Sequence, residues 1–235
     1  MLSRIKRMTI FVTPKRTWRV IAGARRKLYA QIGLSLIDEL TGRAPVGRIS
    51  SHLYIDDGQG GWRETNLKPV VTSRGALAFP EVESHRPLVA GQPARQYRVQ
   101  IEAEFYRPFY RTTADGIDLN IFPYNDDQGP LTIDPQQPVS VKLAPATNYP
   151  FPSHVTVIRG VVKAAGVPVA DAEVSCSNVE RVVTDERGNF GLPIRNKPKN
   201  TPFPIDATDH RTNKTGNTSV KIPNDVGKNV TINIS

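Results

Sequence analysis

Short stretches in which apolar and polar residues alternate recur along the chain. Residues 97–105 are apolar at odd positions and polar at even ones, and residues 117–121, 139–143, 219–222 and 229–234 follow the same logic. A period of two puts successive side chains on opposite faces of a strand. The 20 prolines and 17 glycines are spread between these stretches, and proline is poorly tolerated inside helices. The sequence therefore predicts an all-β fold of antiparallel β-sandwich type.

Two parts of the sequence echo one another. Residues 34–46 and 155–169 each contain an alternating strand, a turn and a Pro-Val step. Residues 70–79 and 182–190 each contain a β-branched strand, a turn with a glycine, and a strand with a phenylalanine. This duplication predicts two related sandwiches in tandem.

The separation of the two similar parts of the sequence predicts the domain boundaries. The turn glycines, Gly75 and Gly188, lie 113 residues apart, about the length of one small domain, and both are expected to adopt positive φ. We expect a first sandwich at residues 34–144, a linker rich in proline and asparagine at 145–154, and a second sandwich at 155–235.

The net charge of +9 is concentrated near the N-terminus. Residues 1–35 contain nine lysines or arginines and no acid, whereas the remaining residues contain 22 basic and 22 acidic groups. Residues 1–33 are therefore predicted to form a basic arm, and apolar residues at three- and four-residue spacing from Thr17 to Ile32 favour a short helix within it.

Three interpretations of this arm remain open. It is a solvated tail, a docking arm that packs Trp18 and Tyr29 on a neighbouring subunit, or a segment that binds nucleic acid or an anionic surface. Nucleic acid is disfavoured as a partner because a basic run without ordered aromatic platforms is weak evidence for it.

The N-terminus does not read as a secretory signal. Its apolar run at residues 8–12 is followed at once by Pro14 and Lys15, whereas a signal peptide needs a longer one. The acid-free, arginine-containing composition also fits a mitochondrial transit peptide. No window approaches 18 uncharged apolar residues, so no membrane span is expected.

Two segments of the predicted second sandwich resemble a known family. Residues 166–174 (GVPVADAEV) and 184–190 (TDERGNF) are similar to the carboxypeptidase regulatory-like domain, a member of the transthyretin-like, or prealbumin-like, sandwiches. The resemblance covers about residues 155–235, and the first sandwich is a more divergent relative. It implies a spacer or assembly module of the kind found in proteases, receptors, adhesins and phage-tail-like particles.

Without an evident export signal, the leading hypothesis is a structural protein of a phage tail or a contractile injection system. Such a protein would assemble in the cytoplasm and end as part of a virion or phage-tail-like particle. Its partners would be protein subunits, in homo- and hetero-oligomers. A surface or carbohydrate-binding module is the alternative.

The sequence carries no recognised catalytic motif. His52, His85, His154 and His210 lack metal-ligand spacing, and no nucleophile elbow, phosphate-binding loop or dinucleotide fingerprint is present. We therefore expect no enzymatic activity, no cofactor and no metal. The lone Cys176 excludes an intrachain disulfide and is predicted to be a buried strand residue.

Two chemical alternatives remain. Hydroxyisourate hydrolase shares the transthyretin-like fold, but that family ends in Tyr-Arg-Gly-Ser, whereas this chain ends in Ser235 and its nearest echo, at residues 110–113, lacks Gly-Ser. An isopeptide bond would join Lys163 to Asn229 or Asn233 with Glu173 as the acid, against the plainer interpretation of exposed strand faces.

The predicted partner-binding residues combine basic and aromatic side chains, which are common at interfaces. Phe105, beside three of the aromatic ones, is instead expected in the core. The predicted contact residues are Arg16, Trp18, Arg19, Arg25, Arg26, Lys27 and Tyr29 in the arm, with Trp62, Tyr106, Phe109 and Tyr110 beyond it.

Overall fold

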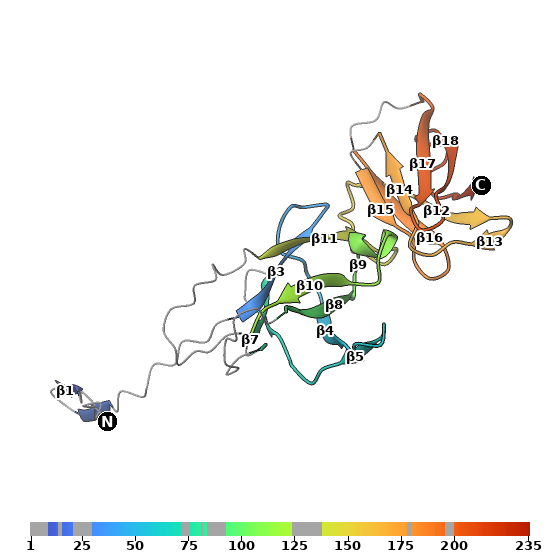
Figure 1. Cartoon of the computed structure of the whole chain (residues 1–235). Helices are drawn as coiled ribbons and strands as arrows, with labels where there is room; N and C mark the ends of the chain where they lie inside the picture. The colour runs from blue at the N-terminus through green and yellow to red at the C-terminus, as the bar shows by residue number, and fades with distance from the viewer. Residues whose placement is uncertain are drawn as a thin grey trace.

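The computed structural model is built from β-strands (Figure 1). It describes residues 9–13, 16–20, 30–71, 76–80, 82–83, 93–123, 138–177, 180–195 and 200–235. Within these ranges the one helical element is a short 3-10 turn, η1 (Phe109–Thr112). The predicted all-β class is confirmed. Nowhere in the described ranges is there a helix with the length and apolar character needed to cross a bilayer.

The N-proximal sandwich has two layers that meet at the tight turn between β8 and β9. Its nine strands form one continuous sheet of order β5-β4-β8-β9-β11-β3-β7-β6, with β10 paired to β8. One layer is thus β5-β4-β8-β10, and the other is β6-β7-β3-β11-β9. Its elements are β3 (Ala30–Asp38), β4 (Ile49–Asp56), β5 (Trp62–Glu64), β6 (Val70–Val71), β7 (Ala76–Pro80), β8 (Arg95–Ala103), β9 (Tyr106–Pro108), η1, β10 (Ile117–Ile121) and β11 (Val139–Pro145).

The core of this sandwich follows from the alternation in its strands. On β3, Leu34 and Leu36 are buried while Ser35 between them is only partly covered. They join Val99 and Ile101 of β8 and Phe79 of β7 in one buried cluster. Burial of such a side chain contributes roughly 1.5–3 kcal/mol each, so this cluster holds the two layers together.

The C-proximal sandwich has two four-stranded layers. One contains β16, β12 and β19, with β13 at one end of β12, and the other has the order β15-β14-β17-β18. The strands are β12 (Thr156–Ala164), β13 (Val167–Pro168), β14 (Glu173–Cys176), β15 (Glu180–Val183), β16 (Asn189–Ile194), β17 (Phe203–Asp209), β18 (Lys214–Val220) and β19 (Asn229–Ile234).

This sandwich has its own core. Ile158, Phe190 and Ile232 lie in a buried cluster that is separate from the first one. Cys176 is fully buried on β14, which confirms its predicted place. Gly188 has φ +72, as predicted, and a Cβ there would lie 2.8 Å from the carbonyl oxygen of Val162.

The two sandwiches share one strand arrangement. β3 is flanked by antiparallel β7 and parallel β11, and β12 is flanked by antiparallel β16 and parallel β19. The opposite layers, β5-β4-β8-β10 and β15-β14-β17-β18, also correspond strand for strand. The parallel pairs correct the expectation of purely antiparallel sheets: the last strand of each sandwich runs alongside the first in the same direction.

The similar sequences at residues 70–79 and 182–190 form only partly equivalent structures. β7 and β16 occupy equivalent places beside the central strand. Val70 and Val71, however, form β6, which pairs with β7 as a hairpin, whereas β15 pairs with β14 in the opposite layer. The counterpart of β15 is β5. A valine pair specifies a strand but not its neighbour. Gly75 lies outside the described residues.

The described ends of the predicted helix are extended, and residues 21–29 lie outside the described residues. Residues 16–20 form β2 (Arg16–Val20), which pairs antiparallel with β1 (Thr9–Thr13) and places Phe11 opposite Trp18. β3 already begins at Ala30, inside the predicted arm. The β-branched residues in both strands favour extended backbone over helix. Figure 1 shows this hairpin apart from both sandwiches.

The segment between β11 and β12 packs on the first sandwich. Tyr149 is buried, its ring lies 5.4 Å from that of Tyr106, and its hydroxyl donates to Asp38 Oδ2 at 2.9 Å. Asp38 also accepts from the backbone N–H of Leu40. This anchoring positions the start of β12, and with it the second sandwich.

Candidate functional site: the junction between the sandwiches

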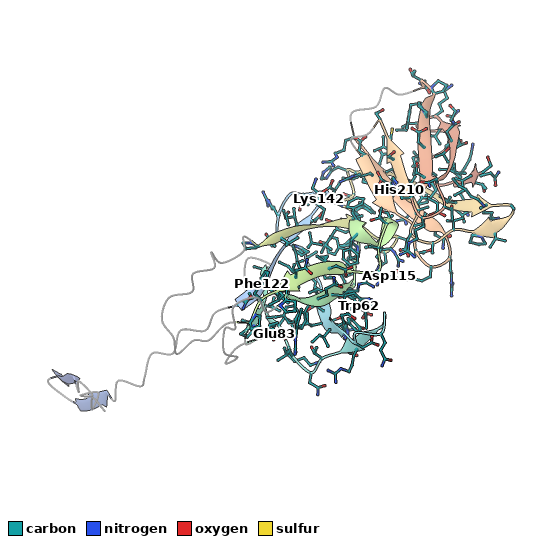
Figure 2. All side chains as sticks on the ribbon, in the orientation of Figure 1. Trp62, Glu83, Asp115, Phe122, Lys142 and His210 are labelled. Carbon is teal, nitrogen blue, oxygen red and sulfur yellow. The ribbon has the colours of Figure 1, made fainter. Side chains whose placement is uncertain are left out.

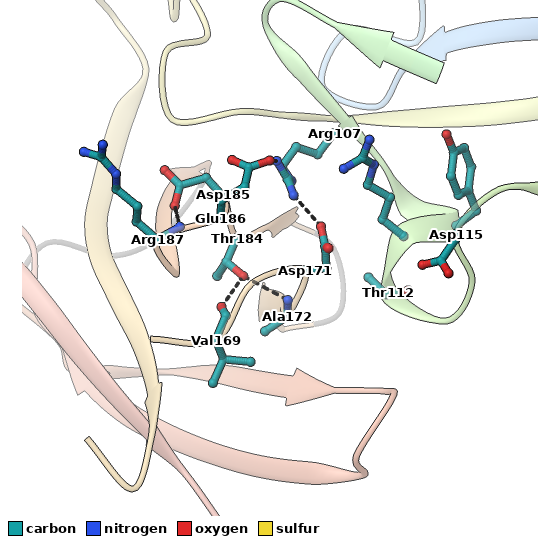
Figure 3. Close-up of polar contacts among 12 residues, drawn as sticks. Arg107, Thr112, Asp115, Val169, Asp171, Ala172, Thr184, Asp185, Glu186 and Arg187 are labelled. Atoms are coloured by element: carbon teal, nitrogen blue, oxygen red, sulfur yellow. Dashed lines mark hydrogen bonds and ion pairs between the residues drawn. The ribbon is translucent and has the colours of Figure 1, made fainter. Parts of the chain in front are cut away.

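The contact between the sandwiches is centred on Arg107 of β9. Its side chain is only 10% exposed. Nη2 donates to Asp171 Oδ1 and Nη1 donates to Glu186 Oε1, both at 2.5 Å, and both carboxylates belong to the second sandwich (Figure 3). Charge-assisted bonds of this kind are stronger than neutral ones, so β9 is fixed against the second sandwich.

Two turns of the second sandwich present these carboxylates. Asp171 precedes β14 with φ +57, and Glu186 lies in the turn between β15 and β16. The Thr184 hydroxyl ties the turns together, since it donates to the Val169 carbonyl at 2.8 Å and accepts from the Ala172 N–H at 2.9 Å (Figure 3). Hydrogen bonds within the second sandwich therefore hold the two turns in place independently of Arg107.

The second turn is also closed from within. Asp185 Oδ1 accepts from the backbone N–H of Arg187 at 2.9 Å and of Asn189 at 2.8 Å. An aspartate that bonds to its own turn favours that turn over extended chain. The Thr-Asp-Glu-Arg-Gly-Asn sequence therefore specifies a tight loop that projects Glu186.

The paired charges shift one another's titration. The Arg107 side chain lowers the pKa of Glu186 below its usual value through their hydrogen bond. Burial alone would lower the pKa of Arg107, but the hydrogen bonds to Glu186 and Asp171 raise it on balance. The guanidinium and the Glu186 carboxylate thus stay charged at neutral pH.

Arg181 of β15 makes a second contact on another side of the junction. Its Nη2 donates to Glu39 Oε1 at 3.1 Å, and its guanidinium lies 4.1 Å from the centroid of the Phe109 ring. Nearby, Arg195 donates to the Leu40 carbonyl at 3.3 Å. Both contacts cross from the second sandwich to the first.

Arg211 makes a third contact, from the turn between β17 and β18. It donates to the carbonyl of Arg111 at 3.1 Å and to Asp115 Oδ1 at 2.9 Å. Arg159 of β12 donates to the carbonyl of Thr147 at 2.9 Å. Contacts on several sides resist rotation better than one would, so the junction opposes hinge motion.

Three of the predicted partner-binding residues have roles inside the chain. Tyr106 is 3% exposed, and its hydroxyl accepts from the Val46 N–H at 3.0 Å. The Tyr110 hydroxyl accepts from the Ile101 N–H at 2.6 Å. Phe109 is covered by Arg181. Phe105 is half-buried against the first core, on its edge rather than in its centre.

Trp62 differs from these three residues. It is half-buried on β5, an edge strand, and the Arg98 guanidinium lies 4.2 Å from its ring centroid. Of the predicted arm residues, Arg16, Trp18 and Arg19 lie on β2. The other four, Arg25, Arg26, Lys27 and Tyr29, lie outside the described residues.

The histidines that the structure describes are dispersed. His52 Nδ1 lies 2.7 Å from Glu64, His210 Nε2 lies 3.1 Å from Glu173, and His154 is exposed. His85 falls outside the described ranges. In the part of the chain that can be examined, no three His, Cys, Asp or Glu side chains gather in a way that could hold a metal ion.

The groups considered for an isopeptide bond are not arranged for one. Lys163 and Asn233 are register partners on β12 and β19, but Asn233 is exposed. Glu173 lies in the opposite layer, where it contacts His210 and Arg181. The chemistry requires a buried lysine beside a carboxyl group, and this arrangement lacks that burial.

Sequence reasoning missed the residues that form the junction. Arg107 was visible as an arginine between aromatic residues, but its partners Asp171 and Glu186 lie 64 and 79 residues further along the chain. The signal that could have found them is the basic residue on a short apolar strand, since a buried arginine needs carboxylate partners.

The sequence matches no protein-family model, and no curated protein is significantly similar to it.

Proposed function

We propose that this chain is a non-enzymatic structural protein. In this proposal the two sandwiches form one stiff unit, and the basic N-terminal segment docks that unit on neighbouring protein subunits. The observation that supports it most is the junction at Arg107, where a nearly buried guanidinium is shared between two carboxylates of the other sandwich. Because these three charged groups bind one another, we assign them a structural role and not a catalytic one.

The N-terminal hairpin supports a docking role. Within the described residues, β1 and β2 hydrogen-bond only to each other. An isolated two-stranded hairpin is marginally stable in water at best. A neighbouring subunit that adds strands or apolar contacts would stabilise it, and the basic residues around it would favour an acidic surface on that subunit.

The proposed context is a phage tail or a contractile injection particle, with both like and unlike subunits as partners. Support comes from the resemblance of residues 155–235 to the carboxypeptidase regulatory-like domain and from a compatible pair of four-stranded layers. Repetition of one strand arrangement along the chain fits a spacer, because each copy adds length without adding a new kind of site.

An N-terminal truncation in the source cell tests the proposal. Removal of residues 1–28 leaves β3 intact, since that strand begins at Ala30. The whole chain is expected to sediment with a large particle, and the truncated chain is expected to fold equally well yet stay in the slow fraction. Circular dichroism of both purified proteins controls for folding.

Either of two results would contradict the proposal. A truncated chain that still co-sediments would remove the docking role of the arm. A whole chain found only in the slow fraction would remove the assembly role altogether.

A further inference from the structure

A polar pocket of about 460 Å³ lies beside the junction. The first sandwich contributes Tyr54, Trp62, Arg98 and Gln100, and the second contributes Asp171 and Arg211. Figure 2 places Trp62 and Asp115, another lining residue, on the side of the first sandwich that faces the second. The volume falls in the range of about 300–1,000 Å³ that is usual for small-molecule sites.

The strand register builds one wall of this pocket. Tyr54 of β4 is the partner of Glu64 on β5 and of Arg98 on β8, and Arg98 is the partner of Asp118 on β10. Directly opposed residues share a face, so these four side chains form one row across the layer. Trp62 pairs with Asp56, two residues from Tyr54, and therefore belongs to the same face.

The aromatic part of the wall is held in place. Arg98 donates to both carboxylate oxygens of Asp118, at 2.6 and 2.8 Å, and stacks on Trp62. Burial, followed by the nearby Glu64 charge, raises the pKa of Tyr54, so its hydroxyl remains a neutral donor. The pocket thus combines an oriented aromatic surface with hydroxyl, amide and guanidinium groups.

Four of the five charged side chains that line the pocket are in ion pairs. Arg98 pairs with Asp118, Arg211 with Asp115, and Asp171 with Arg107. The fifth, Arg111, is a minor cause of the lowered pKa of Glu186, after the hydrogen bond from Arg107. A charged ligand would compete with these pairs, whereas a neutral polar ligand can use the donors and acceptors that they leave over.

We propose that this pocket binds a neutral mono- or disaccharide. A sugar ring has an apolar C–H face that suits the Trp62 and Tyr54 rings. Its hydroxyl groups suit the Gln100 amide and the ion-paired Arg98 and Asp115 side chains. An ion-paired arginine or aspartate still has free N–H groups or lone pairs at a fixed angle, which is what hydroxyl recognition requires. Because both sandwiches line the pocket, the site exists only while the junction is intact.

The two tryptophans of the chain make a direct test available. A Trp18→Phe protein keeps Trp62 as its only tryptophan and leaves the pocket unchanged. We expect titration with glucose, galactose, mannose, N-acetylglucosamine, lactose and maltose to produce a saturable change in Trp62 emission for at least one sugar. The responding sugar should then give the same affinity by calorimetry with the natural chain.

Two variants locate the binding. Trp62→Ala should abolish the calorimetric signal. Phe122→Ala, which removes a 43% exposed aromatic ring that does not line the pocket, should bind as the natural chain does. The Trp18→Phe titration decides the proposal even where Trp62→Ala does not fold.

Three outcomes would overturn the proposal. The first is the absence of a saturable response to every neutral sugar. The second is a response that persists unchanged in a folded Trp62→Ala protein. The third is a response confined to sugars with a carboxylate or sulfate group, which would mean that the paired charges do open for an anion.

Discussion

Arg107 and Asp171, 64 residues apart in the chain, meet at 2.5 Å across the boundary between two sandwiches. Their side chains are 10% and 15% exposed, so most of the water around both charges has been removed. Such a pair is costly to break, because removal of one member leaves the other charge buried and uncompensated. The relative placement of the sandwiches therefore depends on these two residues more than on the exposed ion pairs around them.

The first prediction concerns this pair. Arg107→Ala should lower the free energy of unfolding by about 3 kcal/mol, the lower end of the range for a broken buried pair. Asp171→Ala should have a similar effect, and the double variant should lose less than the sum, with a coupling of about 1–3 kcal/mol. Urea unfolding followed by circular dichroism measures all four proteins of this cycle.

An exposed pair provides the control. Lys228 and Asp225 have a comparable ion pair at 3.0 Å, but the lysine side chain is 65% exposed. Lys228→Ala should therefore change stability by less than about 1 kcal/mol. An Arg107→Ala protein as stable as Lys228→Ala would show that the buried pair contributes little.

The second prediction concerns Tyr149 at alkaline pH. Burial, together with the hydrogen bond that the Tyr149 hydroxyl donates to the Asp38 carboxylate, raises the pKa of Tyr149. The folded chain then holds the Tyr149 hydroxyl proton more tightly than the unfolded chain does. In the unfolded chain, tyrosines titrate at about pH 10. The stabilisation is complete below that pH and falls as the pH rises, by up to about 1.4 kcal/mol per pH unit for one group.

Tyr149→Phe isolates this contribution. The variant should be about 1–3 kcal/mol less stable at neutral pH, because Asp38 loses a hydrogen bond. Its stability should then fall less steeply between pH 10 and 11.5 than that of the natural chain, a window set by the usual tyrosine pKa of about 10. Parallel slopes in urea titrations of the two proteins across this window would contradict the role of Tyr149.

The sequence predicted the strands better than their neighbours. Period-two alternation identified β8 and β19 because one face of each is buried. The same signal cannot say that β19 runs parallel to β12, since pairing depends on the path of the whole chain. Helical spacing from Thr17 to Ile32 predicted a helix in the arm, but residues 16–20 form a strand.

For the candidate contact residues, too, the sequence identified the side chains but not what they contact. Tyr106 and Tyr110 were singled out as aromatic side chains, and composition could not tell an interface between two chains from one within a chain. Their hydroxyls bond to Val46 and Ile101, and Arg107, between them, faces the second sandwich. Trp62, in contrast, remains available to line a pocket because it lies on an edge strand next to a turn.

The distance between the two sandwiches in solution tests the central claim, that the junction makes them one stiff unit. Spin labels can be attached through Ser50→Cys on β4 and Asn217→Cys on β18, two exposed positions, because the natural Cys176 is fully buried. Pulsed electron paramagnetic resonance of the doubly labelled chain should give one narrow distance distribution, which should broaden when Arg107→Ala and Asp171→Ala are added. A broad distribution in the chain with an intact junction would contradict the claim.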